Sequence, residues 1–148
     1  MQDIRILLVD DEEEFVRALS ERLRLRDLSS RTAFSGDQAM DFVREAAPDI
    51  VVLDLAMPGM SGMEVLRLLK GRYPDVRVIV LTGHGNDLDE AEARALGVFE
   101  WLRKPVDIEV LVSRLRAAYQ ASRKGATLSA VTFAEAGELD TARGLLER

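Results

Sequence analysis

The chain has 148 residues, 47% of them hydrophobic and 31% charged, which is typical of one globular domain with a short appendage. It contains no cysteine, which excludes disulfide frameworks, thiolate metal sites and thiol nucleophiles. The net charge of −6 disfavours direct contact with nucleic acid or an anionic membrane surface, and no apolar run is long enough for a membrane span. We therefore expect a cytoplasmic protein with neither nucleic acid nor membrane as a direct partner.

Five short runs rich in isoleucine, valine and leucine predict five β-strands. In chain order, a strand is predicted first at Ile4 to Val9, and a weaker one at Leu28 to Phe34. Further strands are predicted at Ile50 to Leu53, Val76 to Leu81 and Val98 to Leu102. The runs near residues 4, 50 and 76 are continuously apolar apart from Arg5 and Arg77, which indicates strands buried on both faces.

Amphipathic helical patterns, with apolar residues three or four apart, separate these strands. Capping residues mark where the helices begin, and prolines or a glycine follow their ends. The expected N-terminal caps are Asp11, Ser35 with Gln38, Ser61 with Glu64, Asp87 and Asp107. The expected helix ends precede Pro48, Pro74 and Gly97.

Strand and helix alternate five times within about 120 residues, a pattern that predicts a parallel sheet covered by helices on both faces. The fold class is therefore a doubly wound α/β domain with a five-stranded parallel sheet. Ligands of such sheets bind beyond the carboxyl ends of the strands. The residues at those ends are the candidate functional residues.

Three carboxylates, a hydroxyl and an amine follow the predicted strand ends: Asp10, Asp11, Asp54, Thr82 and Lys104. Carboxylates crowded into one cleft repel each other unless a cation joins them, and oxygen ligands of this kind suit Mg²⁺. Asp54 is then a candidate nucleophile toward phosphorus, with the metal and Lys104 neutralising phosphoryl oxygens. Lysine is rare here, three residues against 17 arginines, which makes Lys104 conspicuous.

The order and spacing of these segments resemble the receiver domain of bacterial two-component response regulators, a flavodoxin-like fold. The resemblance covers roughly residues 3 to 120. It is carried by Ile6 to Asp11, Leu53 to Gly62, Leu81 to Gly83, and Lys104 with Pro105.

The resemblance implies that Asp54 accepts a phosphoryl group from a sensor histidine kinase, a histidine phosphotransfer protein or a small donor such as acetyl phosphate. The phosphorylated form would change its contact with an unknown downstream protein, or form a homodimer. The chain would then not be an enzyme in the usual sense, because it catalyses only its own phosphorylation and dephosphorylation.

The resemblance also assigns roles around Asp54. Asp10, Asp11, Asp54 and the main-chain carbonyl of Ala56 would hold Mg²⁺. Thr82 and Lys104 would bind the phosphoryl group, Gly83 would leave room for it, and the bond before Pro105 would be cis. Ala56 and His84 occupy positions that line the approach of the hydrolytic water and so tune the lifetime of the phosphorylated state.

Trp101 stands where the resembled family usually carries a tyrosine or phenylalanine that changes rotamer on activation. Tryptophan is a departure from that pattern, because its side chain is bulkier. Two interpretations stay open: a moving switch residue, and a fixed packing residue on an outer strand.

Residues 1–120 are thus predicted to be the receiver domain, and residues 121–148 a linker followed by a helical tail. Residues 121 to 131 mix small and polar residues, and Phe133 to Leu146 have an amphipathic helical pattern. This tail would either dock on the domain or bind a partner. The alternatives for the whole chain are a pseudo-receiver that binds partners without phosphorylation, and the receiver part of a larger regulator.

Overall fold

Five parallel strands form one sheet in the order β2-β1-β3-β4-β5, and a helix follows each strand. The computed structural model describes residues 3–83 and 85–122. The predicted doubly wound α/β fold is confirmed. The expected helical tail, which includes Phe133 to Leu146, and His84 lie outside the described residues.

The elements follow the predicted order closely. The strands are β1 (Ile6–Val9), β2 (Ser30–Ala33), β3 (Ile50–Leu53), β4 (Arg77–Thr82) and β5 (Glu100–Arg103). The helices are α1 (Glu13–Arg24), α2 (Gly36–Glu45), α3 (Gly62–Arg72), α4 (Asp87–Leu96) and α5 (Ile108–Gln120). One strand has the predicted bounds, and the ends of the others differ by at most two residues.

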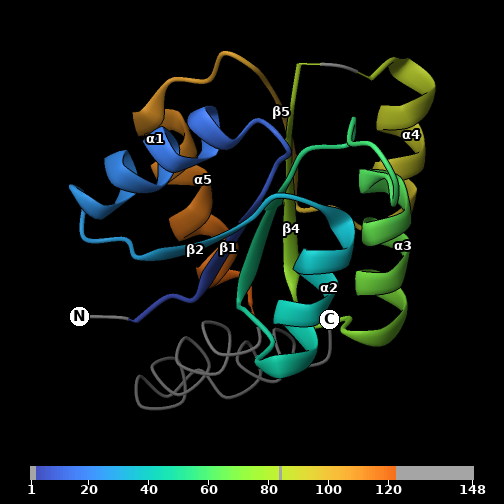
Figure 1. Cartoon of the computed structure of the whole chain (residues 1–148), viewed down its shortest axis with the longest axis horizontal. Helices are drawn as coiled ribbons and strands as arrows, with labels where there is room; N and C mark the ends of the chain where they lie inside the picture. Colours follow the sequence, from blue (N-terminus) through green and yellow to red (C-terminus); the bar gives the residue numbers. More distant parts are fainter. Residues whose placement is uncertain (1–2, 84, 123–148) are drawn as a thin grey trace, which may run out of the picture.

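Two hydrophobic clusters lie on opposite faces of the sheet. Helices α1 and α5 cover one face, and α2, α3 and α4 cover the other (Figure 1). Alternate residues of β1 belong to different clusters: Leu7 packs with the second group of helices and Leu8 with the first. This arrangement explains the continuously apolar strands, since both faces are buried. Within the described ranges, no helix combines the length and apolar character that a bilayer crossing needs.

Most of the predicted helix caps are confirmed, and α4 begins differently. Ser35, Ser61 and Asp107 accept hydrogen bonds from backbone N–H groups of the first turns of their helices. The cap of α4 is Asn86, and the prediction of Asp87 is wrong by one residue. Asn86 Oδ1 accepts from the backbone N–H of Asp89 at 2.9 Å, and the Asp89 carboxylate accepts from that of Asn86 at 3.2 Å. This reciprocal pair satisfies two N–H groups that Asp87 alone would leave open.

Helix α1 also begins one residue later than predicted. Its N-terminal cap is Glu12 instead of Asp11, and the Glu12 side chain makes no capping hydrogen bond. The Asp10 carboxylate accepts from the backbone N–H of Glu12 at 2.9 Å. The turn after β1 is therefore closed by the strand-end aspartate, and Asp11 is exposed.

The sheet register places the strand-end residues together. Val9 of β1 pairs with Leu53 of β3, so the residues that follow them, Asp10 and Asp54, leave the sheet side by side. The backbone N–H of Asp54 extends the ladder by donating to the carbonyl of Val9 at 2.9 Å. Thr82 lies at the end of the neighbouring strand β4. One edge of the sheet therefore collects the polar residues that the sequence singles out.

Candidate functional site

Asp54 is a buried carboxylate whose two oxygens have different neighbours. Only 3% of the residue is exposed. Oδ1 accepts a hydrogen bond from Thr82 Oγ1 at 2.7 Å, and a longer one from the backbone N–H of Ala56 at 3.3 Å. Oδ2 lies 3.7 Å from Lys104 Nζ. One oxygen is thus held by neutral donors, and the other faces a positive charge.

Lys104 connects β5 to the carboxylates at the end of β1. Its Nζ lies 2.6 Å from Asp10 Oδ2 and 2.8 Å from Glu12 Oε1, and it stands over the ring of Phe15 at 4.3 Å from the centroid. Burial by itself lowers the pKa of Lys104, but the hydrogen bonds to Asp10 and Glu12, with the charges of Asp10 and Asp54, raise it above the ordinary value overall. The side chain is therefore a fixed positive charge.

The pKa of Asp10 is also raised, but burial and hydrogen bonding act on it with the opposite signs. Burial raises the pKa of Asp10, and the nearby charge of Asp54 adds to the rise. The hydrogen bonds from Lys104 and from the backbone of Glu12 act against it, but the pKa stays above its ordinary value. A second cation near this pair would relieve the remaining cost of ionising it.

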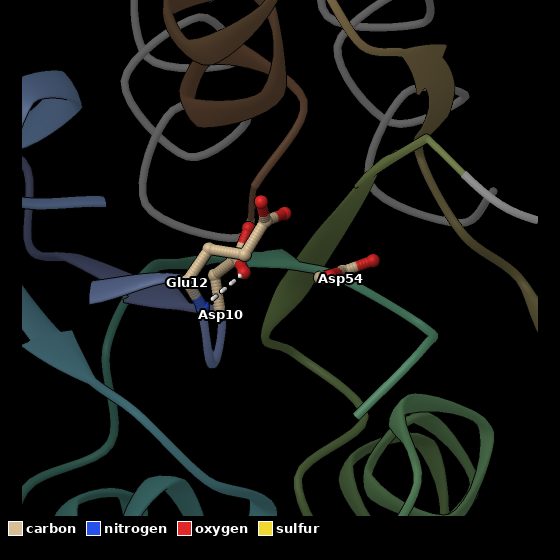
Figure 2. A group of neighbouring side chains, drawn as sticks. All are labelled: Asp10, Glu12 and Asp54. Carbon is tan, nitrogen blue, oxygen red and sulfur yellow. Dashed lines mark hydrogen bonds between the residues drawn. The ribbon is translucent and has the colours of Figure 1, made fainter. Parts of the chain in front are cut away.

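Within the described residues, one group of carboxylates is placed to hold a metal ion. Asp10, Glu12 and Asp54 each offer an oxygen, and these oxygens all lie within 4.8 Å of one another. Figure 2 shows Asp10 and Glu12 coming from the turn after β1, with Asp54 on the adjacent strand end. Hard oxygen ligands in this number suit a divalent cation such as Mg²⁺. Asp11 is exposed and does not belong to this group, so its predicted role as a ligand stays a prediction.

Sequence reasoning missed Glu12 as a member of the site. Its signal was present in the acidic run from Asp10 to Glu14, which also reads as a favourable charge at a helix N-terminus. Glu12 shares with Asp10 a hydrogen bond from Lys104, which lies 92 residues from Glu12 in the sequence.

Three further predicted site residues, Ala56, Gly83 and Pro105, lie next to Asp54 or Lys104. An added Cβ at Gly83 would lie 3.9 Å from Lys104 side-chain atoms, an ordinary contact, so the predicted role of Gly83 in leaving room for the phosphoryl group stays a prediction. Ala56 is exposed, and the peptide bond between Lys104 and Pro105 is cis. His84, the other residue predicted to tune the lifetime, lies outside the described residues.

Trp101 lies in the hydrophobic core with 7% of its surface exposed. Its indole edge packs against Gly85, where an added Cβ would lie 3.1 Å from two ring carbons. The indole Nε1 is buried and has no hydrogen-bond partner within the described residues. The bulky ring thus fits inward, with an unsatisfied N–H group as its cost.

Comparison with known proteins identifies the family that has this arrangement. Residues 6–116 match the response regulator receiver domain family. The chain belongs to this family. The receiver is 36% identical over 123 residues to the transcriptional regulatory protein KdpE of Mycobacterium tuberculosis, an alignment covering 83% of this chain and 54% of that protein. The chain thus spans about half the length of the curated relatives it matches.

Solved receiver domains have the same fold. One from Clostridium thermocellum is 36% identical with a TM-score of 0.73, covering 79% of the present chain and 94% of the solved one. The receiver domain of NtrX from Brucella abortus is 29% identical with a TM-score of 0.74, covering 79% of the present chain and 99% of the solved one. The fold and the family identified from the sequence are therefore confirmed.

Proposed function

We propose that this receiver accepts a phosphoryl group on Asp54 from a histidine kinase or a histidine phosphotransfer protein. The observation that carries the proposal is the asymmetry of Asp54, a buried carboxylate held at Oδ1 by Thr82 and faced at Oδ2 by Lys104. A carboxylate oxygen attacks phosphorus, and the bond between phosphorus and the donor nitrogen breaks. The donor imidazole leaves with its electron pair and is protonated by solvent.

Mg²⁺ supplies the positive charge that the attacking carboxylate and the phosphoryl oxygens need in order to approach each other. The proposed ligands are Asp10, Asp11, Asp54 and the carbonyl of Ala56, a set of hard oxygens that suits this ion. Lys104 pairs with a phosphoryl oxygen, Thr82 donates a hydrogen bond to another, and Gly83 leaves space for the group. In this proposal the positive charges of Mg²⁺ and Lys104 offset the negative charges of the carboxylates and the phosphoryl group.

Phosphorylation then shifts the population of conformations and changes which protein the receiver binds, including a second copy of itself. The protein acts in the cytoplasm by protein contact, without binding nucleic acid directly, and its only catalysis is its own phosphorylation and dephosphorylation. Ala56 has only a methyl side chain, which cannot orient a hydrolytic water by hydrogen bonding. Of the two residues predicted to tune the lifetime of the phosphorylated state, His84 is therefore the one that can bind this water.

The test is intact mass after incubation with acetyl phosphate and Mg²⁺. We expect a gain of one phosphoryl group in the wild type, and none in Asp54→Asn or without metal. If the wild type gains nothing, the measurement is repeated with a panel of phosphorylated histidine kinases as donors. No gain from any donor would contradict the proposal and favour a pseudo-receiver that binds partners without phosphorylation.

We further expect Trp101 to respond to the phosphoryl analogue beryllofluoride. Leaving the buried position would let water satisfy its indole N–H, which relieves a cost of about 1–3 kcal/mol. Trp101 is the sole tryptophan, so its emission reports directly on its surroundings, and a shift to longer wavelength is expected on adding beryllofluoride with Mg²⁺. Unchanged emission in a protein that binds the analogue would make Trp101 a fixed packing residue.

A further inference from the structure

Lys104 has three anionic neighbours in this receiver, and Asp10 and Glu12 lie closer to its ammonium group than Asp54 does. An ammonium group has three N–H donors. Asp10 and Glu12 take contacts at 2.6 and 2.8 Å, whereas the nearest Asp54 oxygen is 3.7 Å away, beyond a hydrogen bond. A phosphoryl group on Asp54 therefore has to draw the ammonium toward β3, against the pull of these two close contacts.

The two close contacts differ in how firmly they are held. The Asp10 side chain is 5% exposed, and its other oxygen already accepts from the backbone of Glu12. The Glu12 side chain is 60% exposed, so water can replace Lys104 as its partner at little cost. The bond between Lys104 and Glu12 is therefore the one that yields.

The position of Glu12 in the chain supports a role other than building the helix. It is the N-terminal cap of α1, where serine, threonine, aspartate or asparagine gives the most stable helix start. Its side chain makes no capping hydrogen bond and extends to Lys104 instead. The residue thus forgoes local stability in favour of a contact with the site.

We propose that Glu12 is a positioning residue that holds Lys104 away from Asp54 until a phosphoryl group competes for the ammonium. This inference rests on the proposed function and adds a residue that sets how readily the phosphorylated state forms. Glu12 and the phosphoryl oxygens bind the same ammonium in alternative arrangements. Shortening or neutralising Glu12 removes the competitor and favours the arrangement in which Lys104 faces Asp54.

The experiment measures beryllofluoride affinity at saturating Mg²⁺, by ¹⁹F NMR or calorimetry, in the full chain. Glu12→Gln removes the charge, and Glu12→Asp keeps the charge but shortens the reach. Both are expected to bind the analogue about two- to fivefold more tightly, the size of a partly exposed ion pair. Glu14→Gln removes an exposed charge from the first turn of the same helix and is expected to leave the affinity unchanged.

The two Glu12 variants separate reach from charge. If Glu12→Asp matches the wild type while Glu12→Gln does not, the effect is one of net charge and the proposal is overturned. Weaker analogue and Mg²⁺ binding in both variants would make Glu12 a metal ligand, and unchanged binding in both would make it a surface residue; either result overturns the proposal. A wild type that binds no beryllofluoride would overturn the proposed function itself, an outcome distinct from these.

Discussion

Replacing Lys104 by methionine is expected to destabilise the folded receiver by about 3 kcal/mol at neutral pH, because it leaves a buried carboxylate without its partner. Asp10 and Asp54 are 4% and 3% exposed, and Lys104 is the cation that contacts the first and faces the second. Methionine keeps most of the length and apolar character of the lysine stem, so the contact with Phe15 loses its charge more than its packing.

The loss of stability in Lys104→Met is expected to depend on pH, and the ionisation of Asp10 determines whether it grows or shrinks as pH increases. Its pKa in the folded protein is already raised by burial, and Lys104 acts against that rise. Without Lys104 the folded pKa rises further above its unfolded value of about 3.9. An acid with a raised folded pKa stabilises the fold below its unfolded pKa and loses that contribution as pH increases through the folded pKa. The free energy of unfolding of the variant should therefore be similar to that of the wild type at about pH 4 and lower than it toward neutral pH.

Urea unfolding of both proteins at about pH 4 and about pH 8, in buffer with a chelator, measures this difference in the free energy of unfolding. Lys70→Met is the matched control. Its amine is also partly buried, but it donates to the backbone carbonyls of Pro74 and Val76 and should show a nearly pH-independent loss over this range. A Lys104→Met loss of equal size at both pH values would contradict the electrostatic explanation and assign the effect to packing.

The fold could be predicted from the sequence because its signals are local. Continuously apolar strands, caps such as Ser35 and Ser61, and the left-handed glycine that ends α4, Gly97, each follow from a few neighbouring residues. The one-residue error at α4 arose where two good caps are adjacent. Asp87 also has an acidic residue three positions later, Glu90, but the reciprocal pair that forms is the one between Asn86 and Asp89.

The core of the site could also be predicted, because parallel strands bring their carboxyl ends to one edge. Asp10, Asp54 and Thr82 needed only the strand order to be placed together. Glu12 could not be identified in this way, since its role depends on the direction of one side chain at a helix start. The fit of the Trp101 ring likewise depends on a contact with Gly85 from another segment, which no local pattern records.

Gly62 illustrates how closely the site is built on backbone packing, and its replacement by alanine is expected to cost about 3 kcal/mol or more. An added Cβ would lie 2.2 Å from the carbonyl oxygen of Asp54 and 2.3 Å from Cα of Leu55, backbone atoms that cannot turn aside. The same segment is fixed by the hydrogen bond from the N–H of Gly62 to the carbonyl of Leu55 at 3.0 Å. Relief of the clash must therefore move either the start of α3 or the backbone at Asp54.

Two other glycines in helices provide a graded control, read by urea unfolding of each alanine variant. At Gly71, in the same helix, an added Cβ meets nothing within 4 Å, so alanine should stabilise the fold by up to about 1 kcal/mol through helix propensity. At Gly36 the nearest atoms are the Met60 carbonyl oxygen at 2.8 Å and Met60 Cβ and Val65 Cγ2 at 2.9 Å, less close than the nearest atoms at Gly62, so an intermediate loss is expected. The predicted order of stability is Gly71→Ala, then Gly36→Ala, then Gly62→Ala, which counts as last if it fails to fold. A Gly62→Ala protein as stable as Gly36→Ala would mean that the turn after β3 can shift without cost, and that Asp54 is not held by the close approach of α3.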